Sequence, residues 1–146
     1  MRLTVLMLIA VSVAQPKHAV TTDLRGVWVA DIARCDFGVA SQPLRLALKV
    51  TRTENRLNVV EVSNTEDGTG LTQRQYLLRR GLSPTRSAVG RAKITGRTAV
   101  LRLPERLDQW RISEDGSELF VTRWIGPSSM AHQQVLLFRR STELPI

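Results

Sequence analysis

Apolar and polar side chains alternate with a period of two through most of this chain, and this feature constrains its fold more than any other. In the segment 44–51 every second residue is Leu or Val, and Arg45 and Lys49 lie between them. One apolar face and one basic face are typical of a half-buried antiparallel strand. Similar alternation elsewhere predicts short strands at 26–32, 44–52, 57–63, 71–79, 88–94, 97–103, 107–113, 117–124 and 132–140.

The connections between these segments are short. The segments 95–97 and 114–117 each carry a glycine, Gly96 or Gly116, where a hairpin often needs a positive φ. Short connections make neighbours in sequence neighbours in the sheet, and closing the sheet removes its exposed edges. We therefore predict an all-β, antiparallel up-and-down meander barrel of about eight to nine strands, with a two-sheet β-sandwich as the alternative.

The first fourteen residues have the pattern of a secretory signal peptide. Arg2 precedes an apolar run from Leu3 to Val13, and small residues at Ser12 and Ala14 precede the expected cleavage point. A bilayer span needs about 20 apolar residues, and Lys17 ends this run earlier. We expect a signal peptide at 1–14, a flexible start of the mature chain at 15–23, one barrel domain at 24–142, and a periplasmic or extracellular location.

Charge and residue usage exclude several classes of protein. Hydrophobic residues at 42% and charged residues at 23% exclude a chain disordered throughout. A single cysteine, Cys35, excludes an intramolecular disulfide framework, and we expect a small, partly buried thiol there. Its redox state and the oligomeric state of the protein stay open.

Two sequence patterns carry a resemblance to a known kind of protein. Gly26-Val27-Trp28 at the start of the first predicted strand resembles the opening of lipocalin-type barrels. Together with Asp36-Phe37-Gly38 and the stretch Trp110–Val121, which contains Ser-Glu-Asp-Gly, it resembles small exported bacterial proteins of uncharacterised function. This resemblance implies a lipocalin-like barrel with structural roles for Gly26 and Trp28. It also implies a basic residue of the last strand over the Trp, either Arg139, our first assignment, or Arg140.

No arrangement of residues supports catalysis or a metal site. His18 and His132 are far apart and have no metal-ligand spacing, and Asp36 beside Cys35 opposes a reactive thiolate. The acidic pairs 66–67 and 114–115 each precede a glycine, which turn formation explains. Glu61 and Asp108, inside predicted strands, are the candidates for paired carboxylates, and they are too few to support an enzyme. We therefore predict a binding protein without enzymatic activity, cofactor or metal.

Two surfaces are candidates for binding. The first is an apolar barrel lining for a small ligand, formed by the aromatic residues of the strands: Trp28, Trp110, Phe120, Trp124 and Phe138. The alternative that these side chains simply fill the barrel stays open.

The second candidate is an Arg-rich face in the segment 79–102, which contains no acidic residue. Such a face is expected to bind an anionic envelope polymer or surface, although basic side chains also serve as a solvated outer surface. Nucleic acid is disfavoured because the segment lacks aromatic residues for stacking. The basic residues are Arg79, Arg80, Arg86, Arg91, Lys93, Arg97 and Arg102.

Overall fold

The computed structural model describes residues 23–78, 90–127 and 129–145, and these ranges contain nine strands and one 3-10 helix. The short helix η1 (Ile32–Arg34) follows the first strand. Every predicted strand is present, with ends within a few residues of the expected ones. The strands are β1 (Gly26–Ala30), β2 (Arg45–Arg52), β3 (Arg56–Thr65), β4 (Gly68–Leu77), β5 (Gly90–Thr95), β6 (Thr98–Leu103), β7 (Arg106–Ile112), β8 (Glu118–Ile125) and β9 (His132–Ser141).

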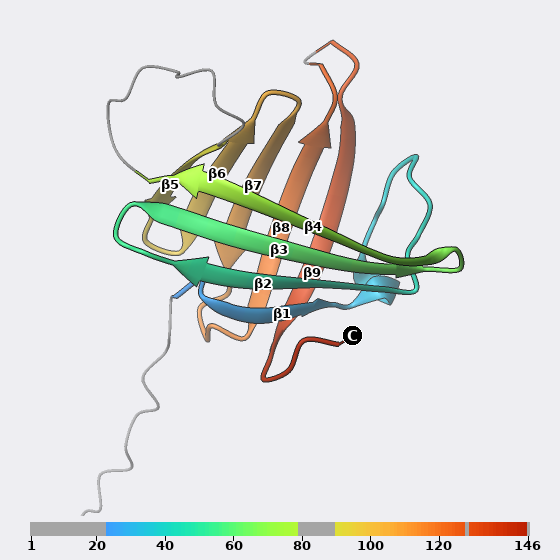
Figure 1. Cartoon of the computed structure of the whole chain (residues 1–146), viewed down its shortest axis with the longest axis horizontal. Coiled ribbons are helices and arrows are strands. Elements are labelled where there is room, and N and C mark those ends of the chain that lie inside the picture. The colour runs from blue at the N-terminus through green and yellow to red at the C-terminus, as the bar shows by residue number, and fades with distance from the viewer. Residues whose placement is uncertain (1–22, 79–89, 128, 146) are drawn as a thin grey trace, which may run out of the picture.

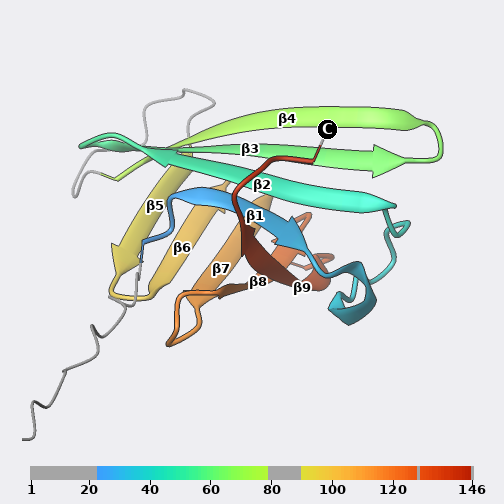
Figure 2. The ribbon, with the colours of Figure 1, turned by 90° about the horizontal axis from the view of Figure 1, so that it is seen from below.

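The strands form a closed barrel in sequence order, and β9 returns to pair with β1. Figure 1 shows β2, β3 and β4 crossing in front of β6 to β9 at a steep angle, and Figure 2 shows the same crossing from below. Closure confirms the meander barrel and excludes the sandwich alternative.

One junction of the described strands departs from the antiparallel pattern. β4 and β5 run parallel, whereas the other neighbouring strands pair antiparallel. An odd number of strands in a closed meander requires one parallel contact, because alternating directions cannot match around the ring. The alternation of side chains predicts the strands, and because their number is odd, one pair of neighbouring strands has to be parallel.

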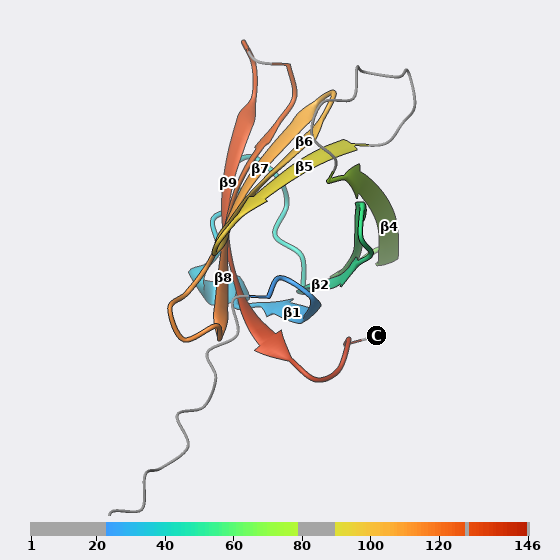
Figure 3. The ribbon, with the colours of Figure 1, turned by 90° about the vertical axis from the view of Figure 1, so that its left-hand side faces the viewer.

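The parallel junction, which we call the seam, is short. It consists of the pairs Tyr76–Gly90 and Leu77–Arg91. Residues 68–75 of β4 have no strand partner on this side among the described residues, and Figure 3 shows β4 standing apart from β5 over much of its length. A Cβ on Gly90 would lie 2.6 Å from Cδ1 of Tyr76, so the close approach of the two strands requires glycine.

The buried apolar residues form one cluster with members from all nine strands, and its large side chains at the β1 end of the barrel include Trp28 and Phe138. Trp28 and Phe138 have no exposed surface, and Trp110 and Ile112 are 2% and 1% exposed. Full burial of each such side chain stabilises the fold by about 1.5–3 kcal/mol. The end of the barrel that holds Trp28 is therefore closed by part of this packed core.

The two predicted glycine turns are confirmed. Gly96 and Gly116 have φ of 58° and 75°. Oδ1 of Asp115 accepts hydrogen bonds from the Ser113 hydroxyl and from the backbone N–H and hydroxyl of Ser117, which lower the pKa of Asp115 to about 2. The acidic pair 114–115 thus has a role in its turn.

The predicted signal peptide at 1–14 lies outside the described residues, as does the segment 15–23 apart from Asp23. The Asp23 carboxylate accepts hydrogen bonds from Arg25, which lower its pKa. Within the described ranges, no helix has the length and apolar character needed to cross a membrane.

Candidate ligand-binding site

Trp28 and Arg140 close the packed end of the barrel. The indole Nε1 of Trp28 donates a hydrogen bond to the Leu24 carbonyl at 2.9 Å, and the Arg140 guanidinium lies 4.1 Å from the centre of the indole ring. Arg140 also donates hydrogen bonds to three backbone carbonyls, those of Asp23, Arg25 and Gly116. A cation over an indole face is an attractive contact, and the hydrogen bonds fix its position.

Our first assignment for this contact, Arg139, is wrong. Successive side chains of a strand point to opposite faces, so Phe138 and Arg140 face the interior and Arg139 faces outward. Arg139 instead forms an ion pair with Asp31 at 3.1 Å. Gly26 has the expected structural role: its φ is 126°, and a Cβ there would lie 3.1 Å from Nη1 of Arg140.

Two of the five aromatic residues predicted to line the barrel lie on its outer face. In β8 the inward side chains are Leu119, Val121 and Arg123, so Phe120 and Trp124 point outward. The guanidinium of the exposed residue Arg111 lies 4.9 Å from the centre of the Phe120 ring. Both faces of β8 carry apolar residues, and the alternation alone did not distinguish them.

The other three aromatic residues, Trp28, Trp110 and Phe138, face inward and belong to the packed core. Their exposed fractions are between 0% and 2%. A ligand among these side chains would have to displace core packing, so space for a ligand has to be sought elsewhere on the barrel.

Above the packed core, charged side chains from opposite walls of the barrel meet in the interior. Arg123 of β8 binds Glu61 of β3 at 2.9 Å and Asp108 of β7 at 3.3 Å. Arg106 binds Asp108 through two hydrogen bonds, of 3.0 and 2.9 Å, and lies 3.5 Å from Glu61. The Trp110 indole also donates to Asp108, at 3.3 Å. We call Glu61, Arg74, Arg106, Asp108 and Arg123 the interior ion cluster.

The arginines keep both carboxylates of this cluster ionised. Burial alone would raise the pKa of Glu61, but Arg123, Arg106 and Arg74 together hold it below its usual value. Burial likewise opposes ionisation of Asp108, while Arg123 and the hydrogen bonds from Arg106 lower its pKa. Paired carboxylates of this kind are not poised to exchange protons with a substrate.

The sequence places Glu61 and Asp108 inside strands but does not identify their partners. The available signal was their position: Asp108 alternates with the inward residues Trp110 and Ile112, which places a carboxylate inside the barrel. A buried carboxylate requires a cationic partner. Barrel closure decides which arginines supply it.

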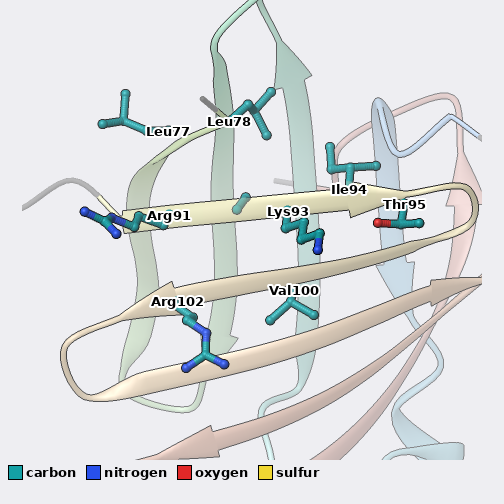
Figure 4. A pocket seen from close by; sticks show the side chains of 9 residues that line it. Leu77, Leu78, Arg91, Lys93, Ile94, Thr95, Val100 and Arg102 are labelled. Atoms are coloured by element: carbon teal, nitrogen blue, oxygen red, sulfur yellow. The ribbon is translucent and has the colours of Figure 1, made fainter. Parts of the chain in front are cut away.

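A cavity of about 490 Å³ lies at the seam (Figure 4). Leu77 and Leu78 line it from the end of β4, and Ala92, Ile94 and Val100 line it from β5 and β6. Arg91, Lys93 and Arg102 are also among its lining residues. The cavity thus combines apolar side chains with a basic rim.

Part of the predicted Arg-rich face forms this rim. Arg91 and Arg102 are direct cross-strand partners, and both are exposed, as is Lys93. Arg97 lies at the other end of the hairpin, 3.9 Å from Glu114. Arg79, Arg80 and Arg86 lie outside the described residues.

The remaining candidate residues have no arrangement for chemistry. His132 is exposed at the start of β9, and His18 lies outside the described residues. Cys35 is a free, half-buried thiol that donates to the Asp31 carbonyl, and burial raises its pKa. Within the described ranges, no three metal-ligating side chains gather at one point.

The solved structures that resemble this chain are β-barrels. The fatty acid transporter REP1-NXSQ has a TM-score of 0.58 and 10% identity, covering 86% of this chain and 100% of its own. The fluorescent protein UnaG has a TM-score of 0.55 and 13% identity, and the match covers 81% of this chain and 97% of UnaG. The siderocalin Ex-FABP, described as having dual ligand specificities, has a TM-score of 0.53 and 11% identity. The match covers 83% of this chain and 76% of Ex-FABP.

The chain has the lipocalin-like barrel fold. At these identities the likeness concerns the lipocalin-like fold alone. No protein-family model matches the sequence, and no curated protein does either.

Proposed function

We propose that this lipocalin-like barrel is a non-enzymatic binding protein that holds a small apolar ligand at the seam. The cavity there carries the proposal: its volume of about 490 Å³ is within the usual range of about 300–1,000 Å³ for small-molecule sites. Leu77, Leu78 and Ile94 are among its lining residues and offer apolar contacts. The fold likeness to a fatty acid transporter and a siderocalin supports a ligand-binding role.

The seam also offers a physical route for ligand access. Only two residue pairs join β4 to β5, so separating these strands breaks fewer backbone contacts than opening any other junction of the described barrel. Elsewhere the ladders are longer, for example along β3 and β4. A ligand can therefore enter here while the packed end of the barrel stays intact.

Binding of the uncharged fluorescent probe N-phenyl-1-naphthylamine tests this site. We expect saturable binding to the wild type and about tenfold weaker binding to Leu77→Gln, because a polar amide replaces an apolar contact. Leu71→Gln is the matched control: Leu71 is on the same strand and 67% exposed, away from the cavity. Equal effects of the two substitutions, or no saturable binding at all, would contradict the proposal.

The basic rim supports a second candidate function, binding of an anionic envelope polymer. Three cationic side chains, Arg91, Lys93 and Arg102, are exposed together on β5 and β6, and such a group attracts a polyanion. We expect Arg102→Glu to abolish salt-sensitive binding to dextran sulfate, and Arg45→Glu on the exposed part of β2 to reduce it far less. Unchanged binding by Arg102→Glu would exclude this function.

We also propose export, with cleavage after Ala14. The support is the residue pattern of the first fourteen positions. Native mass spectrometry of the protein from its own host would give the mass of the mature amino terminus. A chain starting at Gln15 is expected, and an uncleaved chain would refute export.

A further inference from the structure

A continuous row of side chains crosses the outer face of the barrel from β5 to β9. Arg102 lies opposite Arg91 on one side and opposite Leu107 on the other. Leu107 in turn lies opposite Trp124, and Trp124 lies opposite Gln133. Each of the five is next to a buried, inward residue of its own strand, so the row faces outward. We call these five residues the outer row.

The outer row brings together an aromatic residue and cations that the sequence pattern assigned to different surfaces. Trp124 was expected inside the barrel and Arg102 on the Arg-rich face, but closure of the barrel puts both on one outer surface. The next row along the strands contains Lys93, Val100, Gln109 and Thr122. Neither of these two rows contains an acidic residue, so this surface attracts anions.

A pocket of about 350 Å³ lies beside Trp124. Arg102 and Leu107 line it together with Trp124, whereas Glu105 of the adjacent turn is not among its lining residues. Arg102 is two strands away from Trp124, which is about 10 Å at the usual spacing of strands. A ligand in this pocket can therefore contact an aromatic face and a guanidinium at the same time.

Trp124 is the outward aromatic residue of β8 that can accept a stacked ring. The Arg111 guanidinium already lies over Phe120, 4.9 Å from the centre of its ring. Trp124 is half-buried, and within the described ranges no cation covers its indole. Neither Trp124 nor Arg102 makes a hydrogen bond to another described residue. An open indole face near an exposed guanidinium suits an anion that contains rings.

We propose that the outer row binds an acidic polysaccharide, with one sugar ring stacked on Trp124 and a neighbouring carboxylate held by Arg102. This inference rests on the second candidate function, binding of an anionic polymer, and names the class of that polymer. A face of a pyranose ring presents C–H groups, which the negative face of an indole attracts. Gln133, beside Trp124, offers amide donors and an acceptor to the hydroxyl groups of the sugar. The guanidinium of Arg102 can donate two parallel hydrogen bonds to a carboxylate.

Single-stranded nucleic acid matches this surface less well. Proteins that bind it without sequence preference stack successive bases on several aromatic side chains along a basic groove. Here one aromatic face is open, and the side chains next to it are the amide of Gln133 and the hydroxyl of Thr122. These groups suit a ligand that is rich in hydroxyl groups.

The test compares polygalacturonate with poly-L-glutamate, two carboxylate polymers of which only the first contains sugar rings. Both would be titrated against the full chain by isothermal titration calorimetry, at equal carboxylate concentration and constant ionic strength. We expect polygalacturonate to bind at least tenfold more tightly. In Trp124→Leu this preference disappears, because polygalacturonate affinity falls while poly-L-glutamate affinity is unchanged. Phe120→Leu, on the same face of the same strand, is the matched control and keeps the preference.

Fluorescence separates stacking from a general loss of structure. Trp28 and Trp110 are 0% and 2% exposed, so a change in tryptophan emission on adding polygalacturonate reports on Trp124. Trp124→Phe keeps an aromatic face, and we expect it to retain the preference without the change in emission.

Several results would overturn the polysaccharide site. Equal affinities of the wild type for the two polymers, or equal effects of Trp124→Leu and Phe120→Leu, would remove the sugar contact but leave electrostatic binding of a polymer intact. Tighter binding of single-stranded oligothymidylate than of polygalacturonate would replace the polysaccharide by nucleic acid. Failure of both carboxylate polymers and of dextran sulfate to bind would overturn the second candidate function as well.

Discussion

Arg123 links the two walls of the barrel, and its removal should destabilise the fold strongly. Its side chain is 4% exposed and binds Glu61 and Asp108 from different strands. Substitution by Met keeps most of the volume of the side chain and removes the charge. The loss in stability therefore reports on the ion pairs more than on packing.

The contacts that remain determine the magnitude. Breaking a buried ion pair by removing one partner costs about 3–5 kcal/mol. Asp108 keeps both hydrogen bonds from Arg106, but Glu61 keeps only the longer ion pair with Arg106, at 3.5 Å, and the more distant Arg74. We therefore expect the lower end of that range for Arg123→Met, about 3 kcal/mol. For a domain of this size that is roughly a 10 °C decrease in melting temperature.

Urea unfolding followed by tryptophan fluorescence measures this change. Glu61→Gln in the same chain removes the carboxylate that Arg123→Met leaves poorly paired, so the double variant should be more stable than the sum of the single effects by about 1 kcal/mol or more. Arg45→Met at an exposed position is the control and should lie within about 0.5 kcal/mol of the wild type. A loss below about 0.5 kcal/mol for Arg123→Met would refute the reasoning.

Three more predictions concern pH, the packed end of the barrel and the seam. Because the pKa of Glu61 is lower in the folded protein, its ionised carboxylate contributes fully to stability above about pH 4.5, and this contribution is lost as the pH falls through the folded-state pKa. Glu61→Gln should therefore flatten the acid side of a plot of unfolding free energy against pH. Arg140→Leu should cost about 2 kcal/mol in denaturant unfolding and alter the near-UV circular dichroism of the tryptophans, whereas Arg139→Leu should do neither. Gly90→Ala should cost about 1–3 kcal/mol, because its Cβ would meet Tyr76, and amide exchange should accelerate first at the seam; protection unchanged there would count against this account.

The alternation of side chains was sufficient to predict the strands but not the face that each strand turns inward. Along β2, Leu46, Leu48 and Val50 alternate with Arg45, Ala47 and Lys49, and the inward face is evident. Along β8, Phe120 and Trp124 are as apolar as Leu119 and Val121, so the choice depends on the pairing with β7 and β9. Register is a property of the assembled sheet, and for this strand no local signal specifies it.

The candidate site depended even more on the closed structure. Arg74, Arg106 and Arg123 are three among many arginines in the sequence, and nothing local separates them from those on the outer surface. They meet Glu61 only because β3 and β4 lie across the interior from β7 and β8. The seam cavity likewise depends on the parallel contact that an odd number of strands requires.

The short seam also has a consequence for how the chain folds. Every antiparallel ladder from β1 to β4 and from β5 to β9 joins consecutive strands, so two sub-sheets can form from contacts that are local in sequence. Joining them requires distant contacts, such as the hydrogen bond from Arg140 to Asp23, whose positions differ by 117. Such contacts carry the largest loop-closure entropy, so we expect the slow step of folding to be the docking of two preformed halves. The ion pairs across the interior would then form late and mainly slow unfolding, so that the lifetime of the folded barrel depends on them more than its rate of formation does.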